Sequence, residues 1–375
     1  MGEKSLLKIH YQQVIAFLVP GVIYFIANYN GLRLTIDSEN YLLCAIHFSN
    51  TGAFFNAAHG IGCPPLFTLF LSIFSDNAVN WMLLWNGIFI MSTTLIWFTI
   101  AMKIFENQII QWFSLVLLIF GADVLMVHSL LWTEPLFLFL LSFQFYFLIK
   151  FHQKGQINTL VWIIVFGILH TLQRKTGVFF NLSILLVLTW HFIQQGRSQR
   201  ILIKLVSLVL LFLGVILWEL FMQNHSGLSK SSFEMPDPTF FWPTMENYLN
   251  AISLWIIPLN SPAWIKFSST TLLLSGMLWG ILAIKNKAWR WITVSWMIYF
   301  FIRLFWPRLL FSEAQRYMAV AYPFFVISLM GLVQMIVFKT KYKNLILLLF
   351  GLWLVYPTVR TIKNALFYNQ ITQKY

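Results

Sequence analysis

Apolar stretches of about 20 residues follow one another along almost the whole chain, separated by short polar segments. A helix needs a stretch of that length to cross the hydrocarbon core of a bilayer, where its backbone hydrogen bonds are satisfied internally. The pattern therefore predicts an all-α polytopic membrane protein with about 11 transmembrane helices. The predicted spans are residues 14–28, 81–102, 109–127, 134–151, 159–172, 177–193, 201–222, 268–284, 289–305, 317–338 and 345–361.

Two polar segments are too long to be simple turns. The first, residues 29–80, contains an amphipathic stretch at 39–50 and an apolar stretch at 66–74 that is too short to cross a membrane. Both stretches predict short helices lying at the membrane interface. The second, residues 223–265, interleaves prolines with Trp and Tyr, which predicts an ordered loop lying against the membrane. We find no internal repeat and predict a single transmembrane domain over residues 1–375.

Composition and charge narrow the class of protein. The chain is 59% hydrophobic and only 10% charged, which excludes a soluble globular fold. A net charge of +13 on a soluble protein would indicate a nucleic-acid partner, but here Lys and Arg gather in alternate short turns. The positive-inside rule then puts those turns and the N-terminus in the cytoplasm, and we expect no nucleic-acid partner. Residues 29–80 and 223–265 accordingly become outer loops, and the basic residues after residue 359 also fall outside, against the rule.

Both cysteines of the chain, Cys44 and Cys63, lie in the first outer loop. In an oxidising compartment they could form a disulfide, closing a short loop. Two unpaired, small apolar side chains are the interpretation that we favour from the sequence.

Five charged residues within or next to the predicted spans fall at or near the outer ends, and none of the five lies near a midplane. Such residues are expensive in a bilayer and usually functional. A transporter normally holds its coupling residues near the midplane. The pattern instead favours a site at the outer membrane–water boundary, open to lipid. The residues concerned are Asp123, Glu134, Arg174, Glu219 and Arg316.

Several short motifs follow one another in a characteristic order, each at an outer end of a span. They are Asp37-x-x-x-Tyr41, Cys63-Pro64-Pro65-Leu66, Leu131-Trp132-Thr133-Glu134-Pro135-Leu136-Phe137, Leu172-Gln173-Arg174-Lys175-Thr176-Gly177, and Gln315-Arg316-Tyr317 followed by Tyr322-Pro323. In this order, over residues 14–340, the chain resembles the membrane glycosyltransferases of the GT-C superfamily, most closely the protein-mannosyltransferase-like and aminoarabinose-transferase-like branch. It departs from the common pattern at Thr133, where Ser is usual, at Lys175, where an aromatic residue often stands, and in lacking an acidic residue directly beside Asp37.

The resemblance implies a multi-span helical bundle with a catalytic Asp in the first outer loop. It implies a sugar donor carried on polyprenyl or dolichyl phosphate, and a glycan, lipid or protein acceptor at the outer face. We therefore expect a hexosyl- or pentosyltransferase of the cell envelope, and the composition favours a bacterial plasma (inner) membrane.

Glycosyl transfer from a lipid phosphate sets the roles that we expect of individual residues. Asp37 is the candidate base that takes the proton from the acceptor as it attacks the anomeric carbon, and one carboxylate directing one displacement implies inversion. Its structural alternative is to cap a helix that begins at Ser38. The departing phosphate needs cations, preferably guanidinium groups, whose structural alternative is snorkelling to the interface. The candidates are Arg316, Arg174, Lys175 and Arg303.

Supporting or acceptor-binding roles are expected for Tyr41, Glu39, Glu134, Asp123, His59 and Tyr317. Glu134 opens a helix just before a proline, so a favourable interaction with the helix N-terminus is an equal alternative. A divalent metal could be held by Asp37, Glu39, His47 and His59, but the spacing matches no compact ligand motif, so metal use stays open.

Other functions compete with the transferase. A transporter or flippase of lipid-linked sugars or polysaccharide is the main alternative, and a non-catalytic assembly subunit is another. An envelope polysaccharide ligase or polymerase would share the lipid-linked donor and the outer site.

Overall fold

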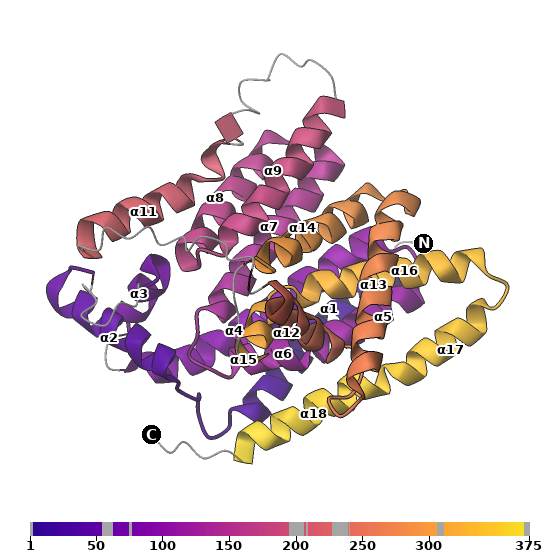
Figure 1. The fold of residues 1–375 in the computed structure, drawn as a ribbon, viewed down its shortest axis with the longest axis horizontal. Helices are drawn as coiled ribbons and strands as arrows, with labels where there is room; N and C mark the ends of the chain where they lie inside the picture. Colours follow the sequence, from indigo (N-terminus) through magenta and orange to yellow (C-terminus); the bar gives the residue numbers. More distant parts are fainter. Residues whose placement is uncertain are drawn as a thin grey trace. The chain divides into compact units, whose positions relative to one another are not determined.

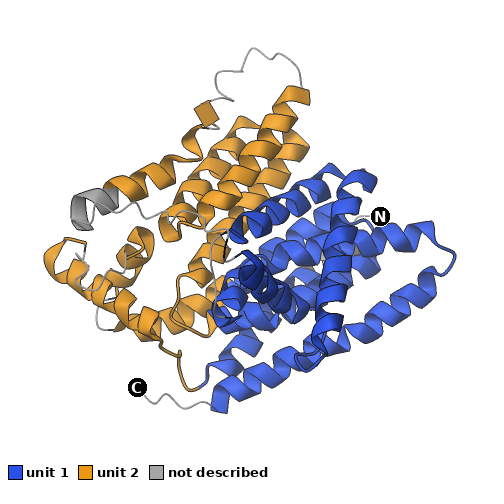
Figure 2. Cartoon of the chain, in the orientation of Figure 1, with its two compact units in different colours: residues 1–29, 90–127, 235–371 blue, residues 30–89, 128–234, 372–375 orange. Residues whose placement is uncertain are grey.

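The structure is a computed structural model that describes residues 3–54, 63–74, 77–194, 206–207, 209–226, 239, 241–305 and 311–370. Every named secondary-structure element in these residues is a helix (Figure 1). The chain divides into two compact units (Figure 2). Unit 1 comprises Met1–Tyr29, Ile90–Val127 and Met235–Ile371, and unit 2 comprises Asn30–Phe89, His128–Glu234 and Thr372–Tyr375. Each unit is therefore assembled from segments that lie far apart in the sequence.

Seven helical segments in the described part of the chain are long and apolar enough to cross a membrane. They are Ala78–Ile104 (α4), Gln108–His128 (α5 and α6), Glu134–Lys154 (α7), Gly177–Gln194 (α9), Ala263–Ala283 (α13), Tyr322–Lys339 (α16) and Lys343–Gln370 (α17 and α18). The described part of the chain thus has the architecture of an all-α, multi-pass membrane protein.

The predicted spans outside these seven correspond to shorter helices. Tyr11–Ala27, within α1 (Glu3–Ala27), and Ile157–Gln173 (α8) are apolar but shorter. Lys287–Arg303 (α14) has 17 residues. Leu213–Ser226 (α11) covers only the second part of the predicted span 201–222, and residues 201–205 and 208 of its first part lie outside the described residues.

A buried hydrogen-bond network holds the helices of unit 2 together. The Gln144 side chain donates to Asn181 Oδ1 at 2.8 Å and its Oε1 lies 2.8 Å from His170 Nε2. Asn181 in turn donates to the carbonyl of Gly167 at 3.0 Å. A Cβ at Gly167 would lie 2.6 Å from the Gln144 amide nitrogen, so the close approach requires glycine. Interhelical hydrogen bonds and close packing at small residues both stabilise helix association in lipid, and this network combines the two.

Tight helix packing forms unit 1 around α16. Trp289 of α14 lies against Gly331 of α16 and donates its indole N–H to Ile327 O at 3.0 Å. Tyr322 lies against Gly121 and donates to Leu117 O at 2.9 Å, which joins α16 to α5 (Gln108–Ile119). Shorter helices complete the unit: α6 (Ala122–His128), α12 (Phe241–Ser253) and α15 (Phe311–Ala319). The last predicted span is divided into α17 (Lys343–Trp353) and α18 (Val355–Gln370).

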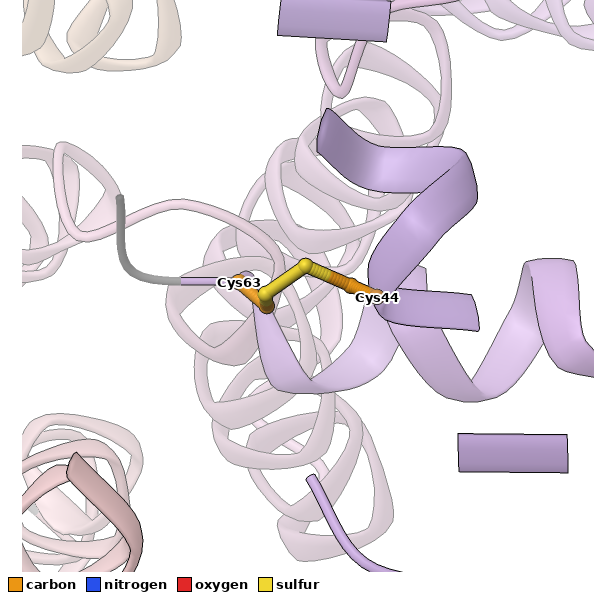
Figure 3. The surroundings of a disulfide bond; sticks show 2 residues. All are labelled: Cys44 and Cys63. Atoms are coloured by element: carbon orange, nitrogen blue, oxygen red, sulfur yellow. A yellow bond between two sulfur atoms is a disulfide. The ribbon is translucent and has the colours of Figure 1, made fainter. Parts of the chain in front are cut away.

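Two short helices form in the first long loop, as predicted from its pattern. They are α2 (Ile36–Thr51) and α3 (Pro65–Ser72). Cys44 of α2 and Cys63, just before α3, form a disulfide with a Cα–Cα distance of 6.2 Å (Figure 3). Our preference for two unpaired thiols was wrong, because α2 and α3 pack against each other and bring the two cysteines within bonding range.

The disulfide should contribute measurably to stability. Replacing both cysteines by Ala should lower the free energy of unfolding by about 3 kcal/mol in the chain-entropy model, given a separation of 19 residues. Thermal unfolding in detergent, with and without reductant, measures this. Reductant should lower the Tm of the wild type to that of the Cys44→Ala/Cys63→Ala variant and leave the variant unchanged. A wild-type Tm that does not change on adding reductant would contradict a stabilising disulfide.

Candidate functional site

The N-terminus of α2 is capped by Thr35 and not by Asp37. Ser38 N–H donates to Thr35 Oγ1 at 3.4 Å, and Thr35 N–H donates to Ser38 Oγ at 3.0 Å, which is a reciprocal capping box. Asp37 and Glu39 lie in the first turn, where their charges meet the helix N-terminus favourably. Asp37 is partly exposed and Glu39 is exposed. Capping, the structural alternative for Asp37, is thus supplied by another residue.

The segment before α2 pairs with the segment before α7. Arg33 N–H donates to Ser129 O at 3.3 Å, and Leu131 N–H donates to Arg33 O at 3.2 Å. The indole N–H of Trp132 donates to Thr35 Oγ1 at 2.8 Å, so the capping residue of α2 is itself held by the motif at 131–137. Asn86 fixes this second segment by donating to the carbonyls of residues 128 and 130 at 2.9 and 3.1 Å.

An ion pair joins the motif at 131–137 to the motif at 172–177. Arg174 Nη1 bonds the carboxylate of Glu134 and donates to Thr133 Oγ1 at 2.6 Å. The Gln173 amide donates to Thr133 O at 3.0 Å. The Glu134 side chain is fully buried, and that of Arg174 is 11% exposed. A buried carboxylate requires such a partner, so the ion pair accounts for Glu134 as a structural residue and restricts the orientation of Arg174.

Lys175, the next residue, is more open than Arg174. Its Nζ lies 3.7 Å from Glu219 Oε1 and 5.2 Å from the centre of the Trp218 ring. Partial burial lowers the pKa of the Lys175 ammonium, while Glu219 opposes that shift. Of the two cations of this motif, Lys175 is the one that a ligand can reach with less rearrangement.

Asp123 of unit 1 is held by three donors. Arg360 and Gln315 donate to its Oδ1 at 2.8 and 2.7 Å, and Trp255 donates to its Oδ2 at 2.6 Å. Its side chain is 1% exposed. Arg360 was not among the predicted site residues, although it falls inside the last predicted span, where the cost of a charge is a signal of function.

A cavity of about 770 Å³ adjoins this cluster in unit 1. Arg360 and Gln315 form part of its wall together with Lys363, and apolar side chains such as Phe311 and Val359 form much of the rest. The cavity therefore combines cations with an apolar lining, which suits an amphiphilic anion.

The remaining cations expected to bind phosphate differ in accessibility. Arg303 is 2% exposed, and its guanidinium carbon lies 4.0 Å from the centre of the Tyr317 ring, a cation–π contact. Tyr317 is fixed by its carbonyl, which accepts from Tyr299 Oη at 2.9 Å. Arg316 of α15 is partly exposed. Burial of Arg303 leaves Arg316 as the better candidate in this unit.

The predicted site residues thus fall into two sets. Unit 2 brings together the motifs around Asp37, Glu134 and Arg174, and there Tyr41 contacts Phe67 edge to face at 5.4 Å. Unit 1 carries Asp123, Arg303, Arg316 and Tyr317. His59 lies outside the described residues. Within the residues that the structure describes, no three His, Cys, Asp or Glu side chains gather into a metal-binding group.

The fold and these contacts define an all-α multi-pass membrane protein with paired charges at its helix ends. In comparisons with known proteins, the chain matches no family model and no curated protein. The resemblance to membrane glycosyltransferases accordingly stays a prediction.

The Glu134–Arg174 pair should be strongly coupled. Replacing either residue by Gln should destabilise the protein by about 3 kcal/mol, because the other charge is left buried without its partner. The double variant should lose less free energy of unfolding than the two single variants together, and the difference, the coupling energy, should be about 1 kcal/mol or more. Thermal unfolding of the wild type, the two single variants and the double variant in detergent measures this coupling energy.

The neighbouring Lys175–Glu219 pair supplies the control. Its side chains are 26% and 28% exposed, so the same cycle should give a coupling below about 1 kcal/mol. Equal couplings for the two pairs would contradict the structural role of the buried one.

Proposed function

We propose that the chain is a membrane glycosyltransferase that moves a sugar from a polyprenyl-phosphate donor to a glycan, lipid or protein acceptor of the cell envelope. The observation that carries the proposal is the bonding of three sequence-distant motifs within unit 2. Trp132 bonds Thr35, two residues before Asp37, and Arg174 bonds Thr133 and Glu134. These motifs are the ones that carry the sequence resemblance.

The chemistry assigns one task to each kind of group. Asp37 accepts the proton of the acceptor hydroxyl or amine while that atom forms its bond to the anomeric carbon. The bond from the anomeric carbon to the phosphate oxygen breaks, and its electron pair leaves with the phosphate. Cations stabilise that leaving group, and the candidates retained are Lys175, Arg174 and Arg316. One displacement inverts the anomeric configuration.

The proposal includes a topology. The chain has eleven spans: the seven long apolar segments, the apolar part Tyr11–Ala27 of α1, and the shorter helices α8, α11 and α14. Its N-terminus lies in the cytoplasm. The first long loop then lies outside a bacterial plasma membrane. The Cys44–Cys63 disulfide in that loop supports this orientation, because disulfides persist in oxidising compartments.

Asp37→Asn should abolish transfer while leaving the protein folded. Loss of a general base lowers a rate by about 100-fold or more. Cells that lack the gene would be complemented with wild type or variant at equal membrane levels, and their envelope glycans compared by mass spectrometry. The wild type should restore a sugar that Asp37→Asn does not restore.

Glu313→Gln is the matched control, because the exposed Glu313 lies in the first turn of α15 and removing its charge changes a helix N-terminus in the same way. This variant should restore the sugar. If Asp37→Asn also restores it, the transferase proposal fails and transport of a lipid-linked sugar becomes the better account. A retained anomeric configuration in the product would exclude the single displacement.

A further inference from the structure

A second cavity, of about 570 Å³, lies between α12 and α13 in unit 1. Its size is typical of sites for small ligands. Trp242, Glu246 and Asn250 line it from α12, and Trp264 and Phe267 line it from α13.

The lining residues are presented in a regular way by the two helices. Trp242, Glu246 and Asn250 stand four residues apart, so they lie above one another on one face of α12. Trp264 and Phe267 stand three residues apart on the first turns of α13. Other residues of α12 are buried and hold that helix in the core of the unit, among them Thr244 and Tyr248. The cavity is therefore a property of the helix pairing and not of a loop.

The connection between the two helices is held from outside the cavity. Trp353 donates its indole N–H to Ile256 O at 2.8 Å, and Tyr356 Oη donates to Ile257 O at 2.7 Å. Trp255 is fixed by its bond to Asp123. With the backbone between α12 and α13 bonded at consecutive residues, the cavity is preorganised, which lowers the entropy lost on binding.

The chemistry of the lining matches a saccharide. Indole and phenyl rings offer flat apolar faces with negative potential, which attract the polarised C–H groups on the face of a pyranose ring. Glu246 accepts hydrogen bonds from hydroxyl groups, and Asn250 both donates and accepts them. A purely apolar ligand would remove these polar groups from water without replacing their hydrogen bonds.

The charge of the cavity selects among saccharides. Among the described residues that line it, Glu246 is the only charged one, so an anionic ligand is disfavoured and a neutral or amino sugar is favoured. The cavity beside Asp123, lined by Arg360 and Lys363, has the opposite charge. These two cavities are thus suited to different ligands.

We propose that the cavity between α12 and α13 binds a neutral or amino-sugar saccharide. Its use as the acceptor site rests on the proposed function, whereas saccharide binding is measured without turnover. The competing account is that Trp242 and Trp264, 69% and 71% exposed, only anchor the helices at the membrane interface.

The test measures binding to the full chain in nanodiscs by saturation-transfer NMR and by titration. The probes are maltotriose, cellotriose, triacetylchitotriose and chitosan trisaccharide, with trigalacturonate as the anionic comparison. At least one neutral or amino saccharide should bind more tightly than trigalacturonate. Trp264→Ala and Trp242→Ala should each weaken its binding about tenfold or more, equivalent to about 1.4 kcal/mol.

Trp279→Ala is the matched control, because Trp279 is 56% exposed near the other end of α13 and lies outside the cavity. It should leave binding unchanged. Three results would overturn the proposal. They are that no neutral or amino saccharide binds, that Trp264→Ala and Trp279→Ala weaken binding equally, or that trigalacturonate binds as tightly as the other saccharides.

Asp37→Asn separates this inference from the transferase proposal. The variant should bind the saccharide as the wild type does, since Asp37 does not line the cavity. If no saccharide binds but Asp37→Asn still fails to restore the sugar in cells, only the cavity proposal is rejected. If the saccharide binds but Asp37→Asn restores the sugar, only the transferase proposal is rejected.

Discussion

A carboxylate buried in an apolar protein must be neutralised, and this constraint fixes helix ends in both units. Glu134 in unit 2 and Asp123 in unit 1 are almost completely inaccessible. Each takes an arginine from far along the chain, Arg174 and Arg360 respectively. Because an unpaired charge at such a position costs several kcal/mol, the start of α7 is tied to the end of α8, and α6 is tied to α18.

The same constraint sorts the acidic residues by role. Glu134 and Asp123 are occupied by strong partners and serve the architecture, whereas Asp37 is partly exposed in a helical turn whose cap is another residue. A group that has to exchange protons with a substrate needs access more than it needs a buried cation. The greater exposure of its carboxylate therefore favours Asp37 over Glu134 and Asp123 as the group that exchanges a proton with a substrate.

The helical class and most long apolar helices could be predicted from the sequence, because length and hydropathy are local properties. The amphipathic stretch predicted at 39–50 begins earlier, at Ile36, since the Thr35–Ser38 capping box extends it. That signal is local and was available in the sequence. The bonds from Trp132 to Thr35 and from Arg360 to Asp123 cross 97 and 237 residues and leave no local pattern. The disulfide likewise depended on how α2 packs against α3.

The Cys44–Cys63 bond also bears on how the protein matures. The helix that carries Asp37 is covalently joined to the segment before α3, and that link needs an oxidant that the cytosol does not supply. Membrane insertion alone therefore yields a precursor in which the Cys44–Cys63 disulfide has not formed. Formation of this disulfide is therefore a chemical step separate from helix insertion, and conditions that reduce it leave α2 without its covalent link to the segment before α3.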